Sequence, residues 1–337
     1  MTHYLARRSP LLIALSLLAF CLFGIALGSA SGSTGFESWF TAMSDDTAWQ
    51  IVWNIRLPRS LGACAAGALL GLAGALAQGL FRNPLADPYL LGSASGASLG
   101  VAVALALFGG NPFATELLVR MGLTGAAFLG ALLAVLLTLV LARGVHHTLH
   151  LLLAGVIVGV VLGAFVSLIT LFRPDVLQGM QGFLLGSTSF IGWTSCALML
   201  GVLLVCVVFA FVLSRVLDAL SLGEATALSL GVPLVSVRVA LICVLALATG
   251  TAVAQTGLVA FVGLAAPHLI RSLVKTKNNW IVLLSSLMGG VLMLVADLMA
   301  RMLLSPQEMP VGVLTAVLGG GYLIWLMYRS QTTRSLQ

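Results

Sequence analysis

The sequence predicts an all-α, polytopic membrane protein with about ten transmembrane helices in a single domain, residues 1–337. Two observations predict this class. First, 60% of the residues are hydrophobic and 8% are charged, whereas a soluble domain carries about 25% charged residues. Second, the apolar residues form successive runs of about 20, the length that a helix needs to cross a bilayer.

Ten apolar windows bounded by charges or turn residues mark the expected helices. They lie near residues 11–30, 60–80, 90–109, 120–142, 149–172, 191–213, 238–254, 257–272, 280–300 and 310–328. The first window follows Arg7 and Arg8 and precedes small residues, as in a secretory signal. Because many more spans follow, we expect an uncleaved first helix. The seventh and eighth windows are almost continuous in the sequence.

Basic residues orient these helices, because cytoplasmic loops carry an excess of Lys and Arg. With a cytoplasmic N-terminus, eleven lie inside: Arg7, Arg8, Arg82, Arg143, Arg215, Arg238, Arg271, Lys275, Lys277, Arg329 and Arg334. Five lie outside: Arg56, Arg59, Arg120, Arg173 and Arg301. The count predicts that both termini are cytoplasmic. Topology also accounts for the net charge of +6 better than a nucleic-acid partner does, since the basic residues form no continuous face.

Two connections are longer than a turn. The outer one, residues 173–193, is Gly-rich and mildly amphipathic, which predicts a short helix that lies at the outer membrane surface or dips into it. The inner one, residues 214–238, contains small residues, two acidic residues and two glycine stops. This composition predicts short cytoplasmic helices and a turn. A folded inner connection is a candidate docking surface.

The stretch QGLFRNPLADPYLLG, residues 78–92, interrupts two apolar runs with polar residues and prolines. Pro84 and Pro88 cannot continue a helix. Asn83 and Asp87 can accept hydrogen bonds from the backbone groups that the helix end leaves free. The stretch therefore predicts a rigid corner on the cytoplasmic side.

Glycine recurs at every fourth position of three expected helices. The sets are Gly67 and Gly71; Gly92, Gly96 and Gly100; and Gly155, Gly159 and Gly163. This spacing lets helix backbones approach closely in lipid. For the third set two interpretations stay open, because these glycines can pack against a neighbour or line a translocation path.

Motifs for chemistry on a substrate are missing from the sequence. It has no GxxxxGK[ST] phosphate loop, so the chain cannot hydrolyse ATP by that route and is not expected to be an enzyme. The five cysteines have no CxxC spacing, and no metal site is expected. Asp297 is the one acidic candidate within a span, and Arg301 four residues later explains it as an ion pair on one helix face. This pairing weighs against an ion-coupled secondary transporter, which stays the alternative.

Several stretches together resemble one known family. RLPRSLGACAAGALLGLAGALAQGLFRNPLADPYLLGSASGA, residues 56–97, is similar to the signature of the FecCD family, the membrane permeases of bacterial ABC importers for iron chelates, haem and cobalamin. Further matches follow in the family's order: LGEATALSLGV, GLVAFVGLAAPHLIR, ADLMAR and EMPVGVLTAVLGG. The resemblance implies the type II ABC importer permease fold in a bacterial inner membrane. It also implies a second permease copy, two cytoplasmic ATP-binding subunits that bind ATP and Mg²⁺, and a periplasmic substrate-binding protein.

Residue roles follow from the same resemblance. Contacts to the ATPase are expected from the inner connection, at Asp218, Gly223, Glu224, Ala227 and Gly231. Docking of the binding protein is expected at Arg56, Arg59 and Arg301, with lipid-headgroup anchoring or a local pair of Asp297 with Arg301 as the alternatives. The path is expected at the subunit interface. The expected cargo is a bulky metal chelate, a ferric siderophore first, with haem and cobalamin as the other candidates.

Overall fold

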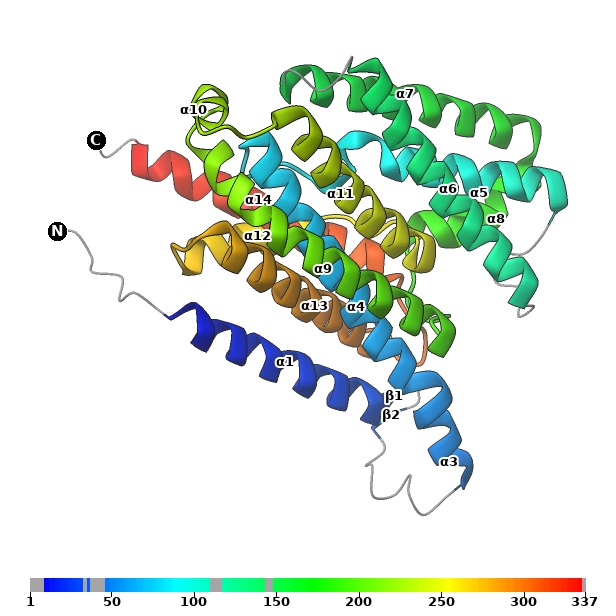
Figure 1. Ribbon diagram of the computed structural model, residues 1–337. Coiled ribbons are helices and arrows are strands. Elements are labelled where there is room, and N and C mark those ends of the chain that lie inside the picture. Colours follow the sequence, from blue (N-terminus) through cyan, green and yellow to red (C-terminus); the bar gives the residue numbers. More distant parts are fainter. Residues whose placement is uncertain (1–8, 33–34, 37–45, 110–116, 143–147, 335–337) are drawn as a thin grey trace.

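The computed structural model describes residues 9–32, 35–36, 46–109, 117–142 and 148–334, which are helical almost throughout (Figure 1). The elements in chain order are α1 (Pro10–Ala30), β1 (Ser31–Gly32), β2 (Gly35–Phe36), α3 (Asp46–Ile51), the π-helical turn η1 (Val52–Arg56), α4 (Leu57–Phe81), the 3-10 helix η2 (Pro88–Leu91), α5 (Ser93–Phe108), α6 (Leu117–Leu141), α7 (Thr148–Phe172), α8 (Pro174–Leu185), α9 (Trp193–Ser221), α10 (Glu224–Ser229), α11 (Leu234–Thr256), α12 (Val262–Leu273), α13 (Asn278–Met302) and α14 (Val311–Arg334).

The predicted all-α membrane fold with about ten spans is confirmed. Among the described residues, seven helical stretches are long and apolar enough to cross a membrane, and α5 and residues Val311–Trp325 are shorter apolar helices. The remaining expected helix, near residues 257–272, is α12. It is separated from α11 at Gly257 and Phe261, whose φ angles of 69° and 68° lie in the left-handed region that a helix cannot contain. The two adjacent apolar windows are therefore two helices.

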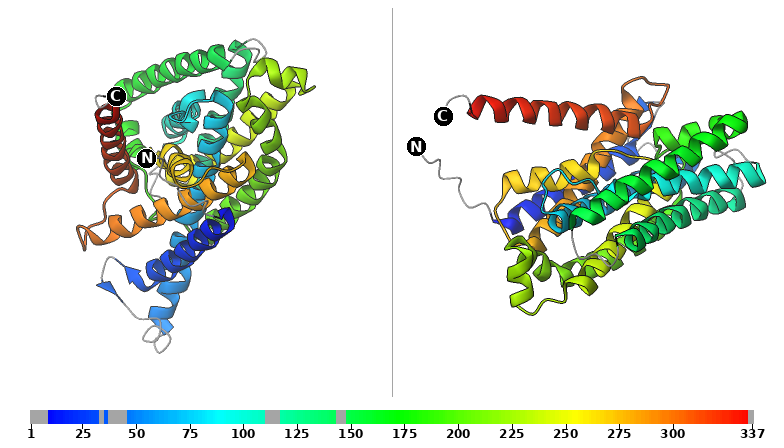
Figure 2. Two further views of the ribbon diagram at one scale, coloured as in Figure 1. Left: turned by 90° about the vertical axis from the view of Figure 1, so that its left-hand side faces the viewer. Right: turned by 90° about the horizontal axis from the view of Figure 1, so that it is seen from above.

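The helix α4 lies at the centre of the bundle and is buried on nearly every side (Figures 1 and 2). Its sequence explains this position, because glycine and alanine let neighbouring backbones come close where apolar burial gives little selectivity in lipid. A Cβ atom added at Gly67 or Gly71 would overlap the backbone of α13, at Gly289 and Ser285. Small residues thus form a tight seam between α4 and α13.

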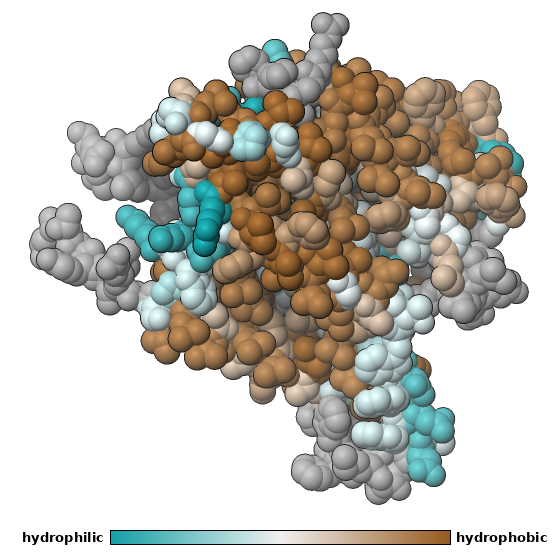
Figure 3. All heavy atoms as spheres, viewed as in Figure 1, coloured by the Kyte–Doolittle hydropathy of each residue, from teal (hydrophilic) through white to brown (hydrophobic). Residues whose placement is uncertain are grey.

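A second seam joins α5 to α6. A Cβ atom at Gly96 would overlap the backbone at Gly130, and one at Gly100 would overlap the backbone at Ala126. The predicted close approach at two of the three glycine sets is therefore confirmed. In contrast, α7 and α9 expose apolar side chains along most of their length, and the space-filling view shows a largely apolar face over α9 and α11 (Figure 3).

Different elements lie at the two ends of the bundle. The first turn of α1, the last turn of α14 and α10 lie at one end, while α3 lies at the other (Figure 1). We name the first the inner end and the second the outer end, following the orientation that the basic residues predict.

The two long connections fold as short helices. At the outer end, α8 buries Val176 and Met180 against a cluster of apolar side chains that includes α5 residues. Its Phe183 carbonyl accepts a hydrogen bond of 2.9 Å from the Leu258 amide. The predicted short outer helix is confirmed, and it packs into the bundle.

The inner connection is shorter than predicted. The helix α9 continues to Ser221, because Leu217 and Leu220 remain buried in the core, and α11 already begins at Leu234. The only helix between them is α10, so the expected plural helices of residues 214–238 are wrong. Between α9 and α11, the chain forms only the short helix α10, about one and a half helical turns long, and then a tight turn.

The polar corner at residues 82–88 is confirmed. After α4 ends, Arg82 takes a left-handed conformation with φ 50°. The Asn83 side chain accepts from the Leu85 amide at 2.9 Å, and the Asp87 side chain accepts from the Tyr89 amide at 2.8 Å. Because local backbone groups are satisfied in this way, the chain reverses without a helix.

Candidate functional site

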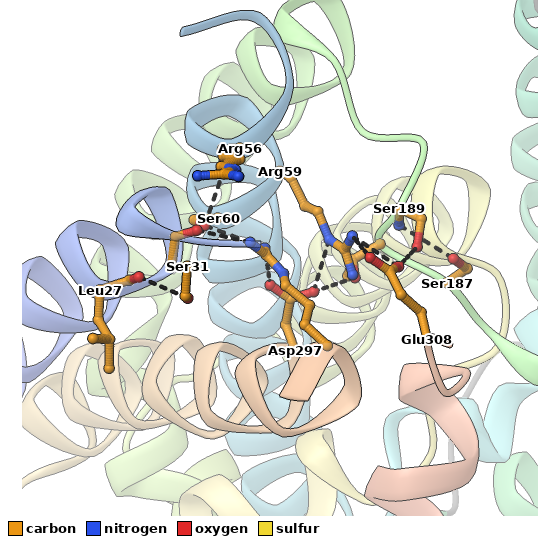
Figure 4. A network of polar contacts seen from close by, with 12 residues as sticks. Leu27, Ser31, Arg56, Arg59, Ser60, Ser187, Ser189, Asp297 and Glu308 are labelled. Atoms are coloured by element: carbon orange, nitrogen blue, oxygen red, sulfur yellow. Dashed lines mark hydrogen bonds and ion pairs between the residues drawn. The ribbon is translucent and has the colours of Figure 1, made fainter. Parts of the chain in front are cut away.

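Four charged side chains form a cluster near the outer end, in which Arg59, Asp297 and Arg301 are buried and Glu308 is partly exposed, and Arg59 on α4 lies at its centre (Figure 4). Its Nη1 atom donates to both carboxylate oxygens of Glu308, at 2.9 Å each. Its Nε atom donates to Oδ1 of Asp297 at 3.1 Å. The planar guanidinium fork suits this double contact, which a lysine could not reproduce.

The second arginine of the cluster is Arg301, one turn after Asp297 on α13. It donates to the other carboxylate oxygen of Asp297, to the Gly28 carbonyl at 2.8 Å and to the Ser60 hydroxyl at 3.2 Å. Asp297 is thus shared by two arginines, and the Thr188 hydroxyl also donates to it. The predicted pair of Asp297 with Arg301 is confirmed.

Glu308 lies on the connection between α13 and α14, at the edge of the cluster. The Ser189 hydroxyl donates to it at 2.8 Å. Burial alone would raise the pKa of Glu308, but the hydrogen bonds and the charge of Arg59 outweigh burial and hold this pKa below its ordinary value. Glu308 therefore carries its charge and ties two outer connections to α4.

The arginines expected to dock a binding protein are inside the chain. Arg56 and Arg59 are 7% exposed and Arg301 is 1% exposed. Within the same chain, Asp297 and Glu308 supply counter-charges to Arg59, and Asp297 supplies one to Arg301. Direct docking stays a prediction, and it would require Arg59 and Arg301 to leave these partners.

A second polar cluster lies at the inner end. Glu224, the first residue of α10, accepts from Nη2 of Arg238 at 2.6 Å and from Nη2 of Arg82 at 3.4 Å. Arg238 is fully buried on α11, and Arg82 caps α4. Glu224 therefore fixes α10 to two long helices of the bundle.

The residues expected to touch an ATPase divide into two groups. Asp218 accepts from both the backbone and the side-chain amide of Asn278, at 3.0 and 2.8 Å, and so binds the start of α13. Ala227 is fully buried. Asp218, Glu224 and Ala227 thus hold the inner connection in place, whereas Gly223 and Gly231, with φ 111° and 78°, form its turns.

The large apolar side chains that α10 and its flanks expose are leucines, which the sequence analysis did not single out. Leu222, Leu228 and Leu230 are 66%, 58% and 63% exposed. In the sequence their signal is three leucines in a short, otherwise small and polar segment, LGEATALSLGV. An exposed apolar patch of this kind at the inner end is typical of a surface that binds another protein.

The three glycines of α7 differ in their surroundings. A Cβ atom at Gly155 would overlap the backbone of η2 at Leu90, so this position is a packing contact. Gly159 has room for a Cβ atom, and at Gly163 such an atom would meet nothing within 4 Å. Open space increases toward the outer end of α7, and a path role for this face stays a prediction.

A model of the FecCD transport family matches residues 14–329. The chain belongs to this family. The hemin transport system permease HmuU of Yersinia pestis is 37% identical over 331 residues, which cover 96% of this chain and 97% of that protein. The vitamin B12 import system permease BtuC of Vibrio cholerae is 38% identical over 331 residues, covering 96% and 94%. The iron(3+)-hydroxamate import permease FhuB of Bacillus subtilis is 34% identical, covering 91% and 79%.

The fold agrees with this family. A solved metal-chelate type ABC transporter in an inward-facing conformation aligns with 94% of this chain and 99% of that chain, with a TM-score of 0.83 and 28% identity. The predicted permease fold of a type II ABC importer is therefore confirmed.

In this FecCD-family chain, both clusters pair residues from motifs that lie far apart in sequence. Arg59 belongs to RLPRS, Asp297 and Arg301 to ADLMAR, and Glu308 to EMPVG. From the sequence, only Asp297 could be paired with Arg301, because residues four positions apart on one helix are neighbours whatever the rest of the fold is. Within the described ranges, no group of three or more His, Cys, Asp or Glu side chains could hold a metal ion.

Proposed function

We propose that the chain is the transmembrane permease subunit of an ATP-driven bacterial importer that moves a bulky metal chelate into the cytoplasm. Membership of the FecCD transport family over residues 14–329 supports this function. Relatives named for hemin, vitamin B12 and iron hydroxamate support the cargo class. Within it we propose a ferric siderophore first, with haem and cobalamin as the candidates to be tested beside it.

One observation carries the coupling part of the proposal: exposed leucines lie on and beside α10, a helix that ion pairs fix to the bundle. Leu228 and Leu230 offer apolar surface at the inner end. A flexible loop would absorb the movement of a partner, whereas Glu224 connects α10 directly to Arg238 on α11 and to Arg82 on α4. Movement of two cytoplasmic ATP-binding subunits would thus reach the central helix, while ATP and Mg²⁺ stay on those subunits.

The outer cluster has a complementary role in the proposal. Arg59 and Glu308 join α4 to the connection that leads into α14. We propose that a periplasmic binding protein docks at this end, where residues 302–308 are exposed. The cluster would hold this docking surface in one arrangement with respect to the central helix.

A second copy of the permease completes the proposed assembly. The helix α7 is apolar and largely unburied within one chain, and Gly163 faces open space on it. We propose that such faces meet in a homodimer, with the path at the interface, in the bacterial inner membrane with both termini in the cytoplasm.

Reconstitution tests the proposed function. The permease is co-expressed with candidate ATPase and binding-protein subunits from the same genome, and uptake of a ferric siderophore, haem and cobalamin into proteoliposomes is measured with and without ATP. ATP-dependent uptake of one chelate supports the proposal and names the cargo. ATP-independent uptake that follows an ion gradient would instead support a secondary transporter.

A further inference from the structure

A groove faces outward between α6 and α9, with α11 as its floor. Its volume is about 360 Å³, within the range of about 300 to 1,000 Å³ that is usual for small-molecule sites. We name it the α6–α9 groove. Its walls belong to helices that are apolar enough to cross the membrane, and Leu198, which lines the groove, is 47% exposed. The groove therefore opens toward lipid and not toward the buried clusters described above.

The lining of the groove changes from polar to apolar along the helix axes. Thr194 and Ser195 lie in the first turn of α9, and Gln255 lies in the last turn of α11, so all three are at the outer end. Val202 and Leu247 each lie eight residues deeper along their helices, about 12 Å at 1.5 Å per residue. A ligand that fits must be polar at one end and apolar at the other.

The polar end has unused hydrogen-bonding groups. The side chains of Thr194, Ser195 and Gln255 make no hydrogen bond to any other described residue. Polar groups left unpaired against hydrocarbon are costly, so a bound partner with hydrogen-bond acceptors is favoured there. The ester carbonyls of a phospholipid lie at the corresponding depth, next to the hydrocarbon layer.

The walls also leave room that packing does not require. A Cβ atom added at Gly125 on α6 or at Gly192 before α9 would meet nothing within 4 Å. These glycines differ from Gly96 and Gly130, whose missing side chains are needed for helix contact. The space at Gly125 thus belongs to the groove.

We propose that the α6–α9 groove binds one acyl chain of a membrane phospholipid. The chain lies between Phe128, Val202 and Leu247, and the ester oxygens accept hydrogen bonds from Thr194, Ser195 and Gln255. The bilayer on this face supplies the ligand directly. The site is separate from the coupling and docking surfaces of the proposed function. The proposal of a lipid site therefore does not depend on which chelate is transported.

Photochemical crosslinking tests this site. The full chain is reconstituted in vesicles of phosphatidylethanolamine in which a small fraction of the lipid carries a diazirine midway along one acyl chain. After illumination, mass spectrometry maps the labelled peptides, with α7 as the reference for general contact with lipid. We expect the peptides of α9 and α11 that line the groove to be labelled more strongly than those of α7.

Two matched glycines of α6 make the test specific. Gly125→Phe fills the groove, whereas Gly122→Phe adds the same side chain into open space on the same helix outside the groove. Labelling in the groove should fall about tenfold in G125F, the loss expected when a bound chain is displaced, and stay unchanged in G122F. Ser195→Phe on the facing wall, with Gly201→Phe as its control, provides a second pair if G125F does not fold.

Two results would overturn the proposal. Groove labelling that equals α7 labelling, or that is the same in G125F and G122F, would show that the groove has no preferred lipid. Reaction of Ser195→Cys with a membrane-impermeant maleimide, at the rate of a cysteine placed at an exposed outer residue such as Gln307, would show that the groove holds water.

Discussion

Arg59 donates a hydrogen bond to each carboxylate oxygen of Glu308, although the two residues are 249 positions apart in the chain. The contact joins the central helix to the connection that precedes α14. Since Glu308 is partly exposed, solvent reduces the strength of this pair relative to the fully buried pairs around Asp297.

Replacement of Glu308 by Gln should destabilise the protein moderately. Glutamine keeps one acceptor but loses the charge opposite Arg59, so we expect a loss of about 1 to 2 kcal/mol, between the values for exposed and buried pairs. Thermal unfolding in detergent, followed by tryptophan fluorescence, measures the loss. Asp175→Asn is the matched control, because its partner Arg173 is also exposed and this pair should add no measurable stability. Equal melting temperatures for E308Q and the wild type would contradict the importance of the contact.

The contribution of Glu308 should depend on pH. Its folded pKa lies below the ordinary value of 4.5, so protons bind the unfolded chain more readily, and the stabilisation is complete above the ordinary pKa. As the pH falls below about 4.5 and through the folded pKa, this stabilisation should be lost. The difference in melting temperature between the wild type and E308Q should therefore be constant near neutral pH and shrink in acid. A difference in melting temperature that grows in acid would contradict a lowered pKa of Glu308 in the folded protein.

Replacement of Asp297 by Ala should be far more damaging. It leaves Arg59 and Arg301 buried with one carboxylate between them, and removal of one partner from a buried pair costs about 3 to 5 kcal/mol. We expect little monodisperse protein by fluorescence-detected gel filtration. Thr188→Val, which removes a neutral donor to the same carboxylate, should remain largely folded. Normal yield of D297A would mean that the cluster does not hold the outer end together.

Changes on α10 should separate coupling from folding. Leu228→Asp removes exposed apolar surface, so we expect the ATPase to co-purify at least about tenfold less, while the melting temperature stays unchanged. Ser229→Asp places the same charge on a neighbouring exposed position and serves as the control. Undiminished co-purification of L228D would exclude the proposed leucine contact.

The turn glycines make a different prediction. A bulky residue at Gly231 finds open space but must adopt φ 78°, which costs about 1 to 2 kcal/mol for an L-residue. We therefore expect G231V to keep the bundle folded but to distort the turn after α10, so that ATP hydrolysis continues with reduced transport. Transport and hydrolysis that fall in proportion would indicate that the turn does not transmit movement.

The helices could be predicted from sequence because each has a local cause. Runs of about 20 apolar residues, prolines in the corner at residues 82–88 and the spacing of Gly67 and Gly71 act over short distances. The sequence predicted two helices at α11 and α12 but not the exact boundary between them, because the left-handed Phe261 that produces it has no local signal.

The candidate sites were harder to predict, because their geometry depends on contacts between distant segments. The count of basic residues placed Arg59 outside, yet only the folded bundle brings Asp297 and Glu308 to it. Similarly, Glu224 was named as a contact for a partner, and only the folded chain shows that it also pairs with Arg238 and Arg82; the partner contact stays a prediction. Charges in a membrane chain are costly unless paired, so they turn inward wherever a partner is within reach.

The short helix α12 has a consequence for how the chain is made. Its 12 residues extend about 18 Å, too little to cross a hydrocarbon layer of about 30 Å, so the non-helical residues 257–261 must complete the passage. Their backbone groups form hydrogen bonds with segments that are synthesised earlier. The Leu258 amide donates to the Phe183 carbonyl, and the Val259 carbonyl accepts from the Tyr89 hydroxyl. This span therefore cannot insert from the translocon into lipid by itself, and must enter the membrane against a bundle that earlier synthesis has already assembled.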